Sequence, residues 1–154
     1  MLCPMMDSDL PLASVVIPNW NGAHHLPVCL GALRAQTYPH IEVILVDNGS
    51  TDGSQALVAE QFPEVHLLAL EHNLGLTGGS NAGFAAAQGE ILISLNNDTE
   101  ADPRFVEALV TALQEHPEAG MAAAKMLLFD QRDTLHSAGD GYGVDGIPFN
   151  RGVW

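Results

Sequence analysis

An apolar segment that runs directly into two amides and a carboxylate is the stretch of this sequence best suited to chemistry. Residues 91–95 are Ile-Leu-Ile-Ser-Leu, and Asn96, Asn97 and Asp98 follow them. Such a run is typical of a buried parallel strand, and open α/β sheets bind ligands beyond the carboxyl ends of their strands. Because Mg²⁺ and Mn²⁺ prefer oxygen ligands, Asp98 with a neighbouring amide is a candidate metal site. The alternative is a simple turn, since Asn and Asp favour turns.

Polar loops also follow two earlier apolar segments. Residues 13–17 lead into Pro18, Asn19, Trp20 and Asn21, and residues 41–46 lead into a loop that contains Asp47, Asn48, Ser50 and Asp52. A carboxylate at such a position can accept a hydrogen bond from a nucleobase N–H or a ribose hydroxyl, and Trp20 can stack on a base. The alternatives are turn capping by the two aspartates and a core or rim position for Trp20.

A third loop, residues 71–83, is rich in glycine. It carries Gly75, Gly78, Gly79 and Gly83, but it has neither the G-x-G-x-x-G spacing after the first strand nor a P-loop motif. Glycine permits a close backbone approach to a ligand, with Asn81 nearby to bind it. Close packing of a helix is the alternative explanation for the same residues.

The elements that would position these loops alternate along the chain. We expect strands at residues 13–17, 41–46, 65–70 and 91–95. We expect helices at residues 24–36, 54–61 and 102–116, and a further helix that the Gly-rich loop enters and that ends at residues 88–89. Ser54 can cap the second helix. Residues 119–129 indicate a further strand, with helix as the alternative. This alternation predicts an α/β fold with three layers: a mostly parallel sheet with helices on both faces and right-handed crossovers.

The charge balance limits the possible partners. The chain has 5 Lys and Arg against 19 Asp and Glu, a formal net charge of −14, which argues against nucleic acid and anionic membrane surfaces. A bound diphosphate would need backbone amides or a metal ion to offset its charge. Cys3 and Cys29 show no metal-ligand spacing, and no apolar run reaches the ~18 residues of a membrane span, so we expect a cytoplasmic protein.

We expect three segments along the chain. Residues 1–12 look like a leader, residues 13–129 form the α/β domain, and residues 130–154 form a Gly-rich segment. That last segment contains no closing helix, so we interpret it as an incomplete part of the fold. The natural protein is then expected to continue beyond Trp154.

Taken together, the loops resemble family 2 glycosyltransferases of the GT-A, Rossmann-like fold, and most closely the rhamnosyltransferase-like branch. The segments that carry the resemblance are residues 15–21, 44–54, 73–75 with 81–83, and 95–98. The resemblance implies a nucleotide-diphosphate-sugar donor (dTDP-, UDP- or GDP-linked), a glycan or lipid-linked acceptor, and Mg²⁺ or Mn²⁺. It also implies cell-surface polysaccharide synthesis, in the cytoplasm or at the inner face of the membrane.

The resemblance also assigns roles to residues. Asp47 would meet the base, Asp52 the nucleotide side of the site, and Asp98 with Asn96 the metal. The implied nucleotide-sugar-binding residues are Pro18, Asn19, Trp20, Asn21, Asp47, Asn48, Ser50, Asp52, Gly75, Asn81 and Asn97. The resemblance further implies that residues 130–154 are the start of an incomplete acceptor-binding half. No catalytic base is assigned, because the matching acidic motif is expected beyond Trp154.

Three interpretations follow. The first is the donor-binding half of an inverting glycosyltransferase. The second is a non-catalytic nucleotide- or partner-binding module, because Asn96 and Asn97 replace carboxylates of many relatives and Ser80 replaces an arginine. The third is a flavodoxin- or receiver-like domain, which would have strand order 2-1-3-4-5, whereas the first strand beside the fourth would favour the transferase.

Overall fold

The structure is a computed structural model, which describes residues 10–142, 144 and 147–150. These residues form two compact units, Met1–Val106 and Glu107–Trp154, which are described separately. Nine residues of the expected leader, 1–9, lie outside the described part. In the described part, no helix combines the length and the apolar character that crossing a membrane requires.

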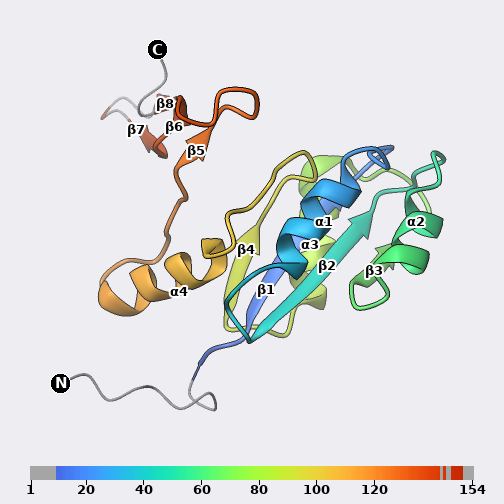
Figure 1. Cartoon of the computed structure of the whole chain (residues 1–154), viewed down its shortest axis with the longest axis horizontal. Helices are drawn as coiled ribbons and strands as arrows, with labels where there is room; N and C mark the ends of the chain where they lie inside the picture. Colours follow the sequence, from blue (N-terminus) through green and yellow to red (C-terminus); the bar gives the residue numbers. More distant parts are fainter. Residues whose placement is uncertain (1–9, 143, 145–146, 151–154) are drawn as a thin grey trace. The chain divides into compact units, whose positions relative to one another are not determined.

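A four-stranded parallel sheet forms the centre of the first unit (Figure 1). The strands are β1 (Ala13–Asn19), β2 (Ile41–Asp47), β3 (His66–Ala69) and β4 (Ile91–Ser94), in the order β3-β2-β1-β4. β1 pairs with β2 along its whole length, so that Asn19 lies opposite Asp47, and with β4 on its other side. The first strand therefore lies beside the fourth, the order expected of the transferase and not of a flavodoxin-like domain.

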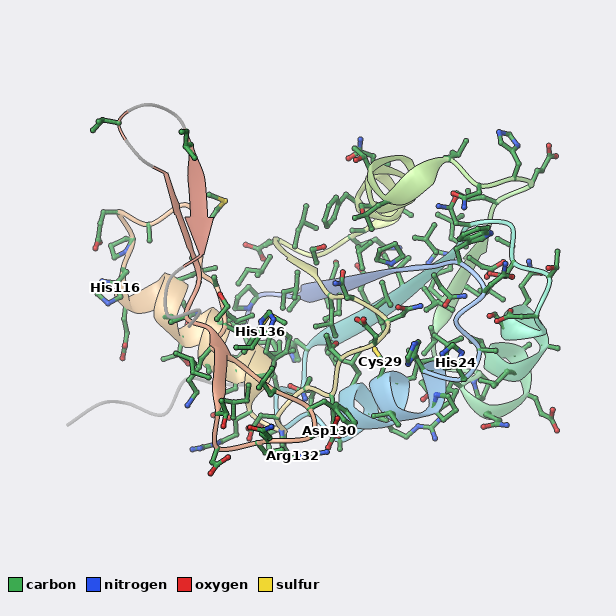
Figure 2. All side chains as sticks on the ribbon, turned by 90° about the horizontal axis from the view of Figure 1, so that it is seen from above. His24, Cys29, His116, Asp130, Arg132 and His136 are labelled. Carbon is green, nitrogen blue, oxygen red and sulfur yellow. The ribbon has the colours of Figure 1, made fainter. Side chains whose placement is uncertain are left out.

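Helices cover both faces of this sheet, which confirms the predicted three-layer α/β fold. They are α1 (Leu26–Arg34), α2 (Ser54–Gln61) and α3 (Gly75–Ala86). Figure 2 shows α3 on one side of the sheet and α1 on the other. Arg34 of α1 donates a hydrogen bond to the Gln61 carbonyl oxygen at 2.7 Å and pairs with Glu64, so α2 lies on the same face as α1.

The two faces of β1 and β2 are both buried. Val16, Ile44 and Val46 form one cluster, against which Phe84 and other residues of α3 pack. Because side chains alternate along a strand, the neighbours Val15, Ile17 and Leu45 point to the opposite face, which α1 covers with Leu26, Cys29, Leu30 and Leu33. Burial on both faces explains why these strands are mostly apolar and do not alternate between apolar and polar residues.

The second unit contains short elements. Most of α4 (Phe105–Glu115) belongs to it, followed by two antiparallel pairs: β5 (Met126–Leu127) with β6 (Leu135–Ser137), and β7 (Asp140–Tyr142) with β8 (Pro148–Asn150). The long strand predicted for residues 119–129 is wrong, since only Met126–Leu127 is a strand. Residues 119–124 are Ala and Gly apart from Met121, which is 90% exposed, and such residues are weak strand formers.

The closeness of α3 to the sheet gives a stability prediction. A Cβ at Gly83 would lie 2.3 Å from Val16 Cγ1 and 2.8 Å from Val46 Cγ2. We expect Gly83→Ala to lower the free energy of unfolding by about 1–3 kcal/mol, because overpacking outweighs the helix propensity of alanine. Denaturant unfolding followed by circular dichroism measures the change.

Gly31→Ala in α1 is the matched control. A Cβ at Gly31 would meet no described atom within 4 Å outside its own helical backbone. The same substitution should therefore raise the free energy of unfolding, by about 0.5–1 kcal/mol. Equal effects of the two substitutions would contradict the packing of α3 described above.

Candidate functional site

The carboxyl ends of β1 and β2 bring the first two polar loops together. Asn19 and Asp47 are the last residues of their strands and lie opposite each other in the register. Both side chains are buried, with exposed fractions of 1% for Asn19 and 0% for Asp47. The polar edge of the sheet therefore has an inner layer that solvent does not reach.

Asn19 connects three loops through its side-chain amide. Its Nδ2 donates to Asp47 Oδ1 at 3.1 Å and lies 3.4 Å from Ser50 Oγ. Its Oδ1 accepts a hydrogen bond from Asn97 Nδ2 at 2.7 Å. The loops after β1, β2 and β4 thus meet at one side chain, as the sequence predicted for this edge of the sheet.

Asp47 is surrounded by donors from the protein itself. Besides Asn19, two groups donate to Asp47 Oδ2: the Ser50 N–H at 3.0 Å and Gln55 Nε2 at 2.7 Å. The resemblance implies that Asp47 meets a nucleobase. With its side chain fully buried, that contact would require one of these donors to move away.

The loops after β1 and β2 are also joined through their backbones. Asn21, at φ 51°, donates its N–H to Ser50 Oγ at 2.9 Å and accepts the Thr51 N–H at 2.8 Å through Oδ1. Asn is among the few residues that tolerate this left-handed conformation. Trp20 lies between Asn19 and Asn21 in the same loop and is 58% exposed, so it is a rim residue and not a core residue.

Asp52 anchors the start of α2 to the first loop. Its Oδ2 accepts the Ala23 N–H at 2.8 Å, and its Oδ1 accepts the Ser54 N–H at 3.1 Å. Desolvation acts to raise the pKa of Asp52, but the hydrogen bonds from the Ser54 hydroxyl and from these amides outweigh it. The pKa of Asp52 therefore lies below its ordinary value.

The prediction that Ser54 caps α2 is wrong. The cap position is Gly53, at φ 90°, and Ser54 is the first helical residue.

Asn48 ties the end of β2 to the start of α3. Its Oδ1 accepts the Leu74 N–H at 2.8 Å and its Nδ2 donates to the Gly75 carbonyl at 2.9 Å. A Cβ at Gly79 would lie 3.1 Å from Asn48 Nδ2, so Gly79 leaves room for this side chain. Gly79 and Gly83 of the Gly-rich loop therefore serve packing.

The exposed part of that loop is the start of α3. Gly75, at φ 74°, is exposed in the first turn of the helix. Asn81 is exposed further along α3, and no hydrogen bond holds its side chain in the described part of the chain. Pro18 lies within β1 and is half-buried, whereas Trp20 and Asn21, in the loop after β1, are exposed.

The loop after β4 presents Asn96 and Asp98 to solvent, while Asn97 is half-buried. Two side chains hold its backbone: Thr99 Oγ1 donates to the Asn96 carbonyl at 2.8 Å, and Cys29 Sγ lies 3.7 Å from the same oxygen. Figure 2 labels Cys29 in α1, which packs beneath this loop. α1 thereby positions the loop that carries Asp98.

The loop after β4 offers few protein ligands for a hard divalent cation. No group of three or more His, Cys, Asp or Glu side chains that could hold a metal occurs among the residues the structure describes. Asp98 supplies one exposed carboxylate and Asn96 an exposed amide oxygen. One or two protein ligands completed by phosphate oxygens and water is the usual Mg²⁺ arrangement, and these residues suit it.

Two residues that help to build the site, Gln55 and Gly22, are not among the predicted site residues. Gln55 reaches Asp47 from α2, and Gly22 lies under the bond between Asn19 and Asn97. A Cβ at Gly22 would lie 2.2 Å from Asn97 Nδ2 and 2.5 Å from Asn19 Oδ1. The Asn-Gly pair in the loop after β1 was the available signal for Gly22, whereas nothing in the sequence indicates Gln55.

The environment of Cys29 gives a testable consequence. Burial raises the pKa of the thiol from 9.0 to about 11; a hydrogen bond with Thr99 lowers it and the charge of Asp98 raises it further. At pH 8.5 the folded thiol should therefore react with iodoacetamide about 50-fold or more slowly than in urea, because the thiolate reacts. Mass spectrometry of a Cys3→Ser variant, which retains Cys29 alone, measures the rates, and equal rates would contradict this environment.

Known structures share this fold. The mannosyltransferase PcManGT from Pyrobaculum calidifontis, solved in complex with GDP-Man and Mn²⁺, superposes with a TM-score of 0.62 at 27% identity, covering 70% of this chain and 33% of that one. Residues 1–349 of S. aureus TarS superpose with a TM-score of 0.64 over 79% of this chain and 43% of that one. TarS is 21% identical, so it supports the fold alone.

Sequence relatives agree with the structures. An uncharacterized glycosyltransferase of Nostoc sp. is 36% identical over 111 residues, which are 70% of this chain and 34% of that protein. Glycosyltransferase AglE of Haloferax volcanii is 35% identical over 114 residues, 70% of this chain and 37% of AglE. The chain thus spans about a third of the length of these relatives. Residues 14–140 match the family described as glycosyl transferase family 2. The chain therefore belongs to glycosyl transferase family 2.

Proposed function

We propose that this chain is the donor-binding half of a glycosyltransferase that moves a sugar from a nucleotide-diphosphate sugar to an acceptor hydroxyl. The observation that carries the proposal is the meeting of the loops after β1, β2 and β4 at Asn19, in a chain of this family. An inverting, metal-assisted reaction fits a site of this kind, in which a base deprotonates the acceptor hydroxyl. On this proposal the base belongs to the acceptor half, and we assign none here.

The nucleotide would lie across the loops after β1 and β2. Trp20 offers an exposed aromatic face, and base stacking on such a face contributes roughly 1–3 kcal/mol. Asp52 lies in the same pair of loops, with a pKa below its ordinary value, so it stays ionised at neutral pH and can accept hydroxyl hydrogen bonds. Asn21 and Ser50 shape the backbone between them.

The diphosphate would lie toward Asp98 and the start of α3. The chain has only 5 Lys and Arg, so its side chains offer little positive charge for two phosphates. Asp98 and Asn96 can hold a divalent cation, which would offset charge on the leaving diphosphate. Residues 75–77 are exposed at the N-terminus of α3, where anions bind favourably, and Asn81 is exposed on the same helix. The Gly75 N–H itself donates to Asn73 Oδ1 at 2.7 Å.

The finer assignment is to the rhamnosyltransferase-like branch, acting in cell-surface polysaccharide synthesis. Its support is the motif set around Trp20, Asp47 and Asp98, together with a 34% identical relative over 141 residues, the O-antigen biosynthesis protein RfbC of Myxococcus xanthus. An undecaprenyl-phosphate sugar transferase of Aeromonas hydrophila, 35% identical over 118 residues, supports a lipid-linked acceptor. A role in polysaccharide synthesis and a lipid-linked acceptor would both place the protein in the cytoplasm or at the inner face of a membrane.

A second candidate is a binding module without turnover. The resemblance implies that many relatives have carboxylates at the positions of Asn96 and Asn97 and an arginine at that of Ser80, so charge on both sides of the phosphates would be reduced here. A module of this kind would bind nucleotide and transfer nothing. Transfer and donor-hydrolysis assays on the full-length gene product separate the two candidates.

Nucleotide binding is the direct test of the proposal. We expect calorimetry with dTDP, UDP and GDP to detect binding of at least one of them, with higher affinity when Mn²⁺ is present, because the cation offsets phosphate charge. Circular dichroism establishes in parallel that the protein is folded. If the folded protein binds none of the three, with or without Mn²⁺, the proposal fails.

Asp98→Ala tests the proposed metal ligand. We expect the Mn²⁺-dependent gain in nucleotide affinity to fall by about 10-fold or more, since the carboxylate beside Asn96 and Asn97 is removed. Affinity measured in EDTA should change little. Glu60→Ala, which removes an exposed carboxylate from α2, is the matched control and should leave both values unchanged. An unaltered Mn²⁺ effect in Asp98→Ala would make Asp98 a turn residue.

A further inference from the structure

A chain of three side chains runs from the interior of the site to its surface. Asp47 is fully buried, Asn19 bonds to it, and Asn97 bonds to Asn19 on the side of the β4 loop. Amides differ from carboxylates because one end donates hydrogen bonds and the other accepts them. The direction of each bond in this chain therefore decides which end of Asn97 faces outward.

The direction is set at Asp47. A carboxylate only accepts hydrogen bonds, and here the backbone N–H of Ser50 and Gln55 Nε2 both donate to its Oδ2. The remaining oxygen, Oδ1, faces Asn19 and also needs a donor. Asn19 must therefore turn its Nδ2 toward Asp47, at 3.1 Å, and its Oδ1 away.

The same logic orients Asn97. Asn19 Oδ1 is buried, and a buried acceptor without a donor is costly. Asn97 Nδ2 meets this need at 2.7 Å. Because Nδ2 is used on the inner side, Asn97 Oδ1 points away from Asn19, and in the described part of the chain no group donates to it. Gly22 has no side chain, which leaves space for this bond.

We propose that Asp47 and Asn19 are positioning residues, which fix the half-exposed Asn97 so that it presents an oxygen to the ligand beside Asp98. The ligand chemistry is a group that seeks an electron pair: a divalent cation or a ribose hydroxyl. This inference rests on the proposed function but assigns Asn19 and Asp47 a different role from direct nucleotide contact. It predicts that the site depends on the polarity of a buried hydrogen-bond chain.

Replacing Asp47 by asparagine reverses that polarity and tests the inference. In Asp47→Asn, the new amide keeps its oxygen toward Ser50 and Gln55 and turns its NH₂ to Asn19. Asn19 and then Asn97 can flip, so the fold survives while Asn97 presents NH₂ outward. We expect at least one of the affinities for Mn²⁺ alone and for UDP in EDTA to fall, by about 10-fold.

Asn97→Asp alone gives the complementary result. Its carboxylate faces Asn19 Oδ1, which Asp47 prevents from turning, so two acceptors oppose each other. We expect the melting temperature to fall by about 3 °C or more. Gln61→Glu, which adds the same charge at the exposed end of α2, controls for charge and should leave the melting temperature within about 1 °C of wild type.

The double variant Asp47→Asn/Asn97→Asp restores a consistent chain with the net charge of the wild type. In this variant Asn19 flips, donates to the new carboxylate at position 97 and accepts from the new amide at position 47, and an oxygen again faces outward. We expect recovery of at least half of the lost melting temperature and of the lost affinity. If the two losses simply add, the proposal is overturned, and so it is if Asp47→Asn is folded and binds both probes as wild type does.

The two probes identify the ligand group. Manganese binding, followed by electron paramagnetic resonance of free Mn²⁺, reports a cation contact, whereas UDP in EDTA reports a hydroxyl contact. If wild type binds neither probe, the proposed function fails, but the melting temperatures still test the hydrogen-bond chain by themselves.

Discussion

A buried carboxylate organises the polar edge of this sheet. Asp47 has an exposed fraction of 0%, and a charge without water is tolerated only when donors surround it. Those donors come from three places: Asn19 at the end of β1, Ser50 in the loop after β2, and Gln55 in α2. Satisfying one side chain therefore fixes the relative positions of β1, the β2 loop and α2.

The distance between helix and sheet is the second constraint, and glycine sets it. Gly83 lets α3 lie against Val16 and Val46, and Gly79 leaves space for Asn48 to reach the start of the helix. With α3 this close, its first turn and Gly75 stand at the same edge as the other loops. Packing glycines thus contribute to the site without facing it.

The sequence predicts the order and type of the elements well because burial on both faces leaves mostly apolar strands such as residues 13–17 and 41–46. It also predicts that Asp47 and Asp98 stand at strand ends. It does not predict that Asp47 faces inward while Asp98 faces solvent. That difference depends on Gln55, which comes from a separate helix, and no local pattern indicates such a partner.

The same limit explains the failure at residues 119–129. An apolar segment forms a long strand only where a neighbour pairs with it or a layer covers it, and this one pairs over two residues and is largely exposed. Hydrophobicity indicates the capacity for burial, whereas the partner determines the outcome. At the site the partner is a donor, and in this segment it would be a strand.

Replacing carboxylates by amides changes what a site requires from its surroundings. A carboxylate presents acceptor oxygens on either side, so its orientation matters little to a cation. Asn96 and Asn97 can offer an oxygen or an NH₂, and only a second layer can decide between them. For Asn97 that layer is Asn19, held in turn by Asp47. The buried carboxylate of Asp47 thus fixes hydrogen-bond direction inside the protein, and Asp98 is the exposed carboxylate that follows Asn96 and Asn97 directly.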